Sequence, residues 1–208
     1  MVTAASGGVH LYGLQRSGTN ALTVYLKNNF NVSIQRGAHE LKSPHNKHFR
    51  PYFKRDAIPS TDYRFELDPI TQISDLDRVL GVNNDHLYII IFKPLGLWMR
   101  SILSYVKYIH DHTKHSGWSA RAERLARDHA CYVEFWTDLA QRHPDRILLI
   151  KFVDFIGDEN ALNHRLGLFL KIDPLGSTRA SHVPMSDTFS KKNRIRALTP
   201  IDVKHQTC

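Results

Sequence analysis

The 208-residue sequence predicts an α/β domain in which helices flank a mainly parallel central sheet, giving three layers. Strand-like segments at residues 9–12, 87–92 and 146–152 alternate with stretches whose apolar residues recur at helical spacing. The second and third of these segments are nearly continuous apolar runs, which is typical of strands buried on both faces of a parallel sheet. A hydrophobic content of 42% and a charged content of 23% are those of an ordinary globular protein.

The N-terminal half begins with a strand, a loop and a helix. Val9, Leu11 and Tyr12 supply the strand, and the helix that follows ends near Phe30. Residues 31–36 alternate apolar and polar side chains, which predicts a second strand. Asp68-Pro69 is a favourable start for a helix that Gly81 ends. The apolar face of this helix holds Ile70, Ile73, Leu76, Val79 and Leu80.

The C-terminal half continues the alternation. Lys93-Pro94 ends the strand at residues 87–92, and helical spacing then predicts a helix over 97–109 and another over about 119–142. The apolar run at 146–152 predicts the last buried strand, and residues 159–170 predict a short helix.

The length of the chain favours one domain over residues 1–208. Within it we expect a long polar, histidine-rich loop over residues 37–67, because long loops in compact domains are usually functional. A basic tail with weak patterning follows over residues 174–208.

Charge and cysteine content set limits on function. The net charge of +8 favours anionic partners, among them nucleotides, sulfated or phosphorylated substrates, nucleic acid and acidic membrane surfaces. The two cysteines, Cys131 and Cys208, are too few for a disulfide framework and favour a reducing compartment. The chain has no apolar run of about 18 residues and no N-terminal secretion signal, so we expect a cytoplasmic protein without a membrane span.

The loop after the first strand, Gly13-Leu14-Gln15-Arg16-Ser17-Gly18-Thr19-Asn20, carries the strongest functional pattern. A strand that enters a helix through a glycine loop directs backbone N–H groups and the positive helix end at one point, which predicts an anion site in a P-loop-type domain. The spacing of Gly13 and Gly18 is that of the Walker A loop. Thr19-Asn20 stands where that motif has Lys-Ser/Thr, and a different cation, Arg16, lies inside the loop.

Ligands of parallel sheets bind outside the carboxyl ends of the strands. This rule predicts that the Arg16 loop, the loop that begins after Gln35-Arg36, and Lys93 lie together at one edge of the sheet.

With these segments in order, the chain resembles the P-loop sulfotransferases that use 3'-phosphoadenosine 5'-phosphosulfate (PAPS). Leu14 to Asn20 is similar to the family's 5'-phosphosulfate loop, which commonly reads Lys/Arg-Ser-Gly-Thr-Thr. Lys93 ends a strand and Ser101 follows on the next helix, as in the family's 3'-phosphate motif. Residues 147–155 resemble a third family strand. The resemblance implies sulfuryl transfer from PAPS, without a metal ion, to a hydroxyl or amine.

The resemblance also implies roles for individual residues. The 5'-phosphosulfate would contact Gln15, Arg16, Ser17, Gly18, Thr19 and Asn20. Arg16 would also stabilise charge on the bridging oxygen as the sulfuryl group leaves. Lys93 and Ser101 would hold the 3'-phosphate, and Lys191 and Lys192 are the candidates for a C-terminal phosphate loop.

An acceptor needs a general base near the sulfur, and the family often places a His or Glu after the second strand. His39, Glu40 and His45 are the candidates here, with the first two nearest the strand end. The acceptor class stays open among carbohydrates, small molecules and peptides.

Other functions remain in view. A sulfotransferase-like nucleotide-binding protein without turnover is the main alternative. A P-loop kinase ranks lower because the Walker lysine is missing. A nucleic-acid-binding protein would account for the charge, but the sequence holds no recognised reader motif.

Overall fold

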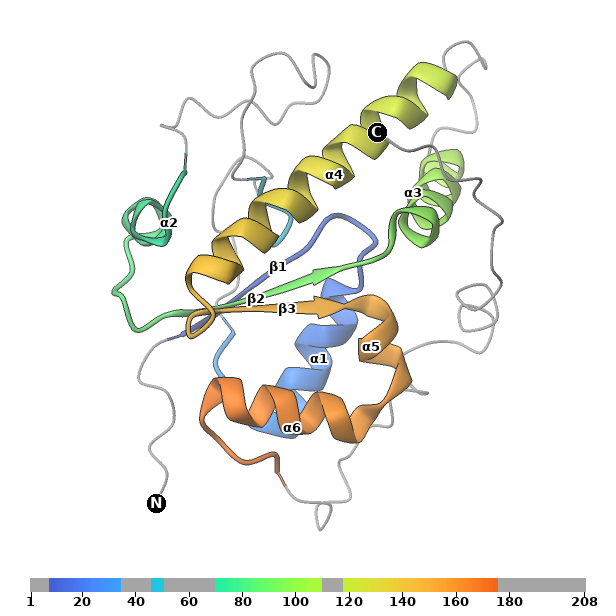
Figure 1. Ribbon diagram of the computed structural model, residues 1–208. Coiled ribbons are helices and arrows are strands. Elements are labelled where there is room, and N and C mark those ends of the chain that lie inside the picture. Colours follow the sequence, from blue (N-terminus) through green and yellow to red (C-terminus); the bar gives the residue numbers. More distant parts are fainter. Residues whose placement is uncertain (1–7, 35–45, 51–69, 110–117, 176–208) are drawn as a thin grey trace.

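The computed structural model describes residues 8–34, 46–50, 70–109 and 118–175 (Figure 1). Its centre is a three-stranded parallel sheet in the order β1-β2-β3. The strands are β1 (Val9–Tyr12), β2 (Leu87–Phe92) and β3 (Ile147–Lys151). The predicted α/β class and the parallel sheet are therefore confirmed for the described part of the chain.

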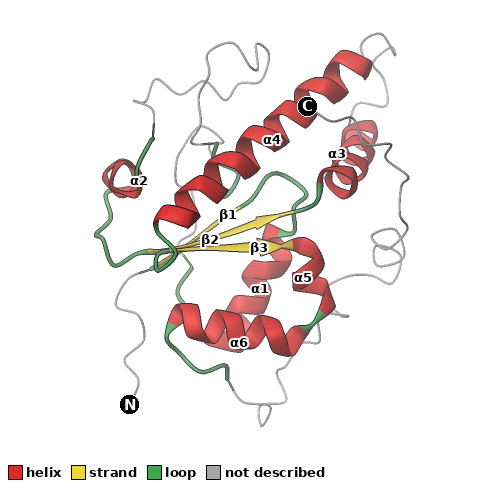
Figure 2. Ribbon diagram, viewed as in Figure 1, coloured by secondary structure: helices red, strands yellow, loops and turns green. Residues whose placement is uncertain are grey.

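Helices cover both faces of this sheet (Figures 1 and 2). One face carries α1 (Thr19–Phe30), α5 (Phe152–Gly157) and α6 (Glu159–Leu170). The other face carries α2 (Ile73–Leu80), α3 (Leu95–Ile109) and α4 (Trp118–Arg142). None of the described helices is long and apolar enough to cross a membrane.

The middle strand β2 supplies both hydrophobic cores. Ile89 and Ile91 belong to the core beneath α1 and α6, whereas Tyr88 and Ile90 belong to the core beneath α3 and α4. Successive side chains of a strand point to opposite faces, so a strand buried on both faces must be apolar at every position. This explains the continuous apolar run in the sequence.

The strand predicted at residues 31–36 is reduced, in its described part, to one parallel bridge between Ile34 and Val9. Val9 pairs with Leu87 on its other side. Ile34 therefore lies beside one edge of β1, and β2 lies beside the other edge. The chain crosses from one side of β1 to the other between Ile34 and β2. Beta1 is therefore the point where the strand order reverses, which is where open parallel sheets place their ligand crevice.

Two boundaries differ from the sequence prediction. Alpha2 begins at Ile73, later than the predicted start at Asp68-Pro69, because Gln72 and Asp75 form a reciprocal capping box there. The predicted cap Asp68-Pro69 lies outside the described residues. Phe152 is not the last residue of β3 but the first of α5, which the apolar pattern alone does not predict.

Alpha5 forms because two phenylalanines on one helix face can both be buried. Phe152 and Phe155 lie three positions apart and are both buried. The ring of Phe155 packs edge-on against the ring of Tyr25 in α1, with the ring centroids 5.7 Å apart. The predicted helices over 97–109, 119–142 and 159–170 are confirmed as α3, α4 and α6.

A buried ion pair ties α2 to the amino ends of β2 and β3. Arg146 Nη1 donates to Asp77 Oδ2 at 2.8 Å, and the Tyr88 hydroxyl donates to Asp77 Oδ1 at 2.6 Å. Arg146 also donates to the His86 carbonyl from Nε and Nη2. This pair lies at the opposite end of the strands from the glycine loop.

Replacing Asp77 should therefore destabilise the fold without touching the glycine loop. Asp77→Ala leaves the Arg146 charge and the Tyr88 hydroxyl buried without this carboxylate, and we expect a loss of about 3–5 kcal/mol in the free energy of unfolding. Asp138→Ala removes a carboxylate from the exposed Arg142 pair and should cost below about 0.5 kcal/mol. Urea denaturation followed by circular dichroism measures both. Equal losses in the two variants would contradict this account.

Candidate functional site

The loop between β1 and α1 needs its two glycines for space. A Cβ on Gly13 would lie 2.7 Å from the carbonyl oxygen of Ile91 in β2. A Cβ on Gly18 would lie 2.9 Å from the Phe152 ring, and Gly18 also has a φ of 102°. Arg16 adopts a left-handed φ of 69°. The loop is thus pressed against β2 and α5 in a conformation that side chains at 13 and 18 would block.

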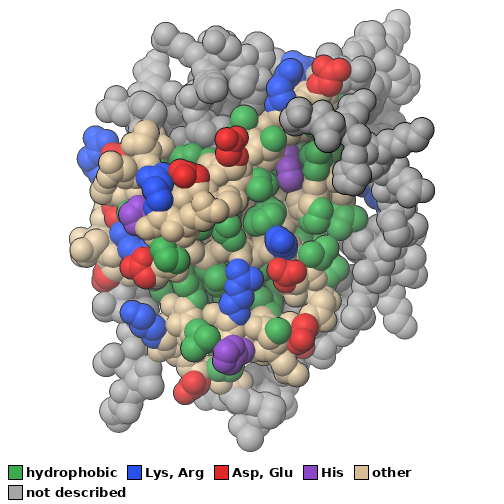
Figure 3. Space-filling view, viewed as in Figure 1, with side chains coloured by type: hydrophobic (Ala, Val, Ile, Leu, Met, Phe, Trp, Pro, Cys, Tyr) green, Lys and Arg blue, Asp and Glu red, His purple; other side chains and the backbone are tan. Residues whose placement is uncertain are grey.

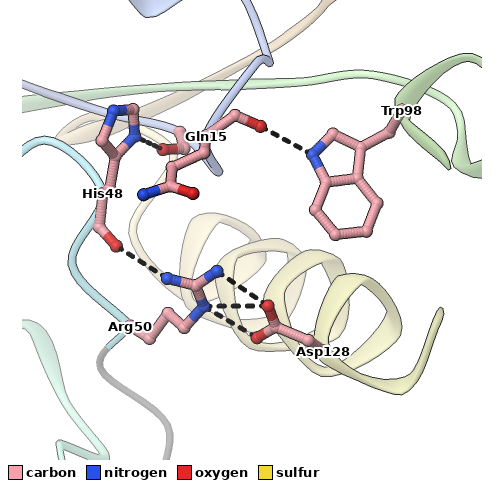
Figure 4. Close-up of polar contacts among 6 residues, drawn as sticks. Gln15, His48, Arg50, Trp98 and Asp128 are labelled. Carbon is pink, nitrogen blue, oxygen red and sulfur yellow. Dashed lines mark hydrogen bonds and ion pairs between the residues drawn. The ribbon is translucent and has the colours of Figure 1, made fainter. Parts of the chain in front are cut away.

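Three consecutive carbonyl oxygens of this loop accept hydrogen bonds from the protein. Gly13 O accepts from His48 Nδ1 at 2.7 Å, Leu14 O accepts from the Ser17 N–H at 3.0 Å, and Gln15 O accepts from Trp98 Nε1 at 2.8 Å. Figure 4 shows Trp98 and His48 reaching the loop from different segments. Because these carbonyl oxygens are bound to donors of the protein, their partial negative charges do not repel an anion at the loop.

The start of α1 keeps donors available. The first N–H groups of a helix have no partner within the helix, and Gly18 at the N-cap has no side chain to accept from them. No acidic residue lies in the first turn. Ser17 is 1% exposed, and its Oγ has no hydrogen-bond partner among the described residues. A buried hydroxyl beside a positive helix end fits an oxyanion ligand.

Lys93 lies at the carboxyl end of β2, next to this loop. Its Nζ is 3.5 Å from Ser101 Oγ on α3 and 4.2 Å from the centroid of the Phe152 ring. Burial, and to a smaller extent the charge of Arg16, lowers the pKa of Lys93 to about 8. The structure therefore brings together Arg16, Lys93 and Ser101, which lie far apart in the sequence.

Phe152 connects the two halves of this site. Its nearest ring atom lies 2.9 Å from the position that a Cβ on Gly18 would take, and the Lys93 ammonium lies over the same ring. The ring face attracts the cation and holds it near the loop. The start of α5, which the sequence pattern does not predict, thus shapes the site.

His129 of α4 fixes the end of β2. Its Nε2 lies 2.7 Å from the Lys93 carbonyl oxygen, so this nitrogen carries the proton and donates. Burial lowers the pKa of His129, which favours the neutral ring. The His129 ring also packs against Trp98, with centroids 5.3 Å apart. One cluster on α3 and α4 therefore positions both the loop and Lys93.

The sequence prediction missed the segment 46–50, which lies against the loop. The Gly13 N–H donates to the Lys47 carbonyl at 2.9 Å, and Lys47 Nζ donates to Asn20 Oδ1. Burial and the charges of Lys47 and Arg50 lower the pKa of His48 to about 4, so this imidazole is neutral at pH 7. The basic composition of the predicted loop over 37–67 was the available signal, but it did not indicate which residues return to β1.

A buried ion pair anchors this segment to α4. Arg50 donates from Nε and Nη2 to the Asp128 carboxylate, with Nη2 and Oδ2 2.8 Å apart (Figure 4). Both side chains are nearly fully buried. A guanidinium and a carboxylate paired in this forked geometry define one orientation of the backbone. Lys47 and His48 are thereby held beneath the loop.

Several predicted site residues lie outside the described residues: His39, Glu40, His45, Lys191 and Lys192. Among the described residues, no three His, Cys, Asp or Glu side chains gather closely enough to hold a metal ion.

No protein-family model, no curated protein and no solved structure matches this chain. Its function must therefore be argued from the geometry of the site.

The space around Gly13 yields a test of the loop. Gly13→Ala forces a methyl group against the backbone of β2, which cannot move without disrupting the sheet, so we expect a loss of about 1–3 kcal/mol in unfolding free energy. Gly157→Ala places a methyl group in open space at the end of α5 and should be neutral or stabilising by up to about 1 kcal/mol. Thermal unfolding of the two variants measures the difference. A Gly13→Ala protein as stable as Gly157→Ala would show that the loop is not packed against β2 in this way.

Proposed function

We propose that this chain is a P-loop-type sulfotransferase that moves a sulfuryl group from PAPS to a hydroxyl or amine of an acceptor. The observation that carries the proposal is the position of Lys93 and Ser101 at the carboxyl end of β2, beside the Arg16 loop. Two anion-binding groups at one sheet edge suit a donor that carries a 5'-phosphosulfate and a separate 3'-phosphate. The strand-order reversal at β1 supports a ligand crevice at that edge.

The loop is suited to the 5'-phosphosulfate. The N–H groups at the start of α1 and the Ser17 hydroxyl supply neutral donors, and Arg16 is exposed and supplies charge. Lys93 and Ser101 supply a cation and a hydroxyl for the 3'-phosphate. This second site would distinguish PAPS from ATP, which has no 3'-phosphate.

The proposed reaction asks little covalent chemistry of the protein. The bond between sulfur and the bridging oxygen breaks, a bond from sulfur to the acceptor oxygen or nitrogen forms, and the acceptor proton moves to a base. The other product is 3'-phosphoadenosine 5'-phosphate. Arg16 would stabilise the negative charge that grows on the bridging oxygen, and the helix end would hold the sulfuryl oxygens.

His39, Glu40 and His45 stay the proposed candidates for the base. His48 contacts the loop directly, but a ring with a pKa of about 4 is a weak proton acceptor. Its Nδ1 is also engaged with Gly13 O. We therefore assign His48 to positioning the loop.

The geometry supports the alternatives less well. Thr19, at the place of the Walker lysine, is buried with its Cγ2 packed toward Gly13, which does not suit a nucleoside triphosphatase or a kinase. Among the described side chains on the face shown in Figure 3, acidic and basic groups are interspersed and form no basic stripe for nucleic acid. A nucleotide-binding protein without turnover shares the proposed donor site and differs only in the transfer step.

Binding of the product nucleotide tests the donor site. At a concentration of about 100 times its Kd, 3'-phosphoadenosine 5'-phosphate should add about 2.7 kcal/mol of stability, which corresponds to a rise of about 5–10 °C in Tm. AMP and ATP should give smaller shifts because they lack the 3'-phosphate. Differential scanning fluorimetry measures all three. Equal shifts from AMP and from the product nucleotide would remove the role proposed for Lys93 and Ser101.

Transfer itself separates an enzyme from a binding protein. Arg16→Ala should abolish transfer of label from PAPS while the protein stays folded, because Arg16 is exposed and lies at the proposed reaction centre. Lys27→Ala, on the exposed face of α1, should transfer at the wild-type rate. Full activity of Arg16→Ala would contradict the proposed mechanism.

The burial of Lys93 predicts a pH dependence. Its pKa of about 8 means that the ammonium is charged below that pH and neutral above it. A bound anion favours the charged form, so affinity for the product nucleotide should be nearly constant between about pH 7 and 8, where its phosphates are ionised, and fall above pH 8 by up to about tenfold per pH unit. Titration calorimetry across this range measures the effect. An affinity that does not change above pH 8 would argue against contact between Lys93 and the nucleotide.

Lys93→Met provides the matched variant. It should bind the product nucleotide more weakly and lose this pH dependence. The pKa of Lys93 is lower in the folded chain than the ordinary 10.5, so the wild-type protein should gain stability as pH rises from about 8 to 10.5. Removing the charge should accordingly stabilise the free protein at pH 7, on the order of 1–3 kcal/mol.

A further inference from the structure

The Walker register gives Asn20 a particular meaning. Counted from Gly13, Asn20 takes the place of the Ser/Thr whose hydroxyl binds Mg²⁺ in P-loop nucleotide sites. In this structure Asn20 Oδ1 instead accepts a hydrogen bond from the Lys47 ammonium. The ammonium of Lys47 therefore lies next to Asn20, the residue at the metal-ligand position of a Walker site.

Lys47 is held there from two directions. Its backbone carbonyl accepts from the Gly13 N–H at 2.9 Å, so its main chain is attached to the start of the loop. The following residues are fixed by the contact of His48 with Gly13 and by the ion pair of Arg50 with Asp128. An ammonium on a flexible side chain is thereby confined to the first turn of α1.

The local electrostatics call for an anion. Lys47 and Lys93 flank the positive end of α1, whose first turn has no acidic residue. Neither lysine forms an ion pair with the described residues 8–34, 46–50, 70–109 and 118–175. Burial lowers the pKa of Lys47 as well, so the charged form is costly until a counter-charge is bound.

We propose that Lys47 binds the donor's 5'-phosphosulfate, or the 5'-phosphate of the product. Its ammonium takes the role that Mg²⁺ has in Walker sites. The identity of this anion rests on the function proposed above. An ammonium has three N–H donors; one bonds to Asn20, and the others are available for anion oxygens. Binding should then need no divalent metal, and Asn20 should orient Lys47 instead of a metal ion.

The test is calorimetric binding of 3'-phosphoadenosine 5'-phosphate to wild type, with EDTA and with Mg²⁺, and to two variants in EDTA. Wild type should bind equally in both buffers. Lys47→Met should bind about 10–100-fold more weakly, the usual effect of losing a charge-assisted hydrogen bond. Lys47→Arg keeps the charge and should recover most of the affinity. Lys27→Met, an exposed lysine near the other end of α1, is the control and should match wild type.

Wild-type binding that disappears in EDTA and returns with Mg²⁺ would overturn the proposal, as would wild-type affinity in a folded Lys47→Met protein. Circular dichroism and Tm establish that each variant is folded. Inorganic pyrophosphate in EDTA, titrated into the same proteins, separates this inference from the donor assignment. Loss of pyrophosphate binding in Lys47→Met alone supports Lys47 even if the nucleotide does not bind. Absence of binding of both probes to wild type overturns both proposals.

Discussion

The site depends on how the protein binds the carbonyl oxygens of one loop. A glycine loop between a strand and a helix contains as many carbonyl groups as amide groups, and exposed carbonyls would repel an anion. Here the oxygens of Gly13, Leu14 and Gln15 are bound by His48, by the next turn of the loop and by Trp98. The helix end that follows can then act as a net positive pole. The indole and the imidazole are structural in this sense, although they lie at the site.

Positive charges lie close together in the same region, and their repulsion destabilises the free protein. Arg16 and Lys93 are close enough for one charge to lower the pKa of the other, and Lys47 is partly desolvated nearby. Repulsion of this kind costs stability, and it is retained at sites where a ligand relieves it. The buried pair of Arg50 with Asp128 holds the segment 46–50 in place at this end of the sheet. We interpret the cationic cluster as a binding feature and the Arg50–Asp128 pair as its structural support.

Much of the fold followed from local pattern. Strands buried on both faces produce uninterrupted apolar runs, so β2 and β3 and the helices after them were predictable within a few residues. Alpha5 was not, because a helix of six residues is too short to show a period, and Phe152 continues the apolar run of β3. The prediction of a strand over 31–36 also exceeds what the described residues form, since among residues 31–34 only Ile34 bridges to β1. Alternation alone does not show how far a strand pairs.

The candidate site was predictable where its residues follow a strand and not where a distant segment of the chain returns to the glycine loop. Arg16 and Lys93 each follow a strand, so strand order alone predicts that they lie together, and in the structure the charge of Arg16 lowers the pKa of Lys93. Lys47 reaches the loop through contacts with Gly13 and Asn20, and no spacing in the sequence encodes such a return. Its position depends on a tertiary ion pair between α4 and the segment 46–50.

We propose that the backbone N–H groups at the start of α1 bind the anion. The most direct measurement is a ¹H–¹⁵N titration with 3'-phosphoadenosine 5'-phosphate in which the amide signals of Gly18, Thr19 and Asn20 are followed. We expect saturable shifts that are largest at these amides. The amides of Asp77 and His86, which lie near the amino ends of the strands, should shift less. Shifts that leave these loop amides unchanged, while the nucleotide binds elsewhere, would contradict this proposal.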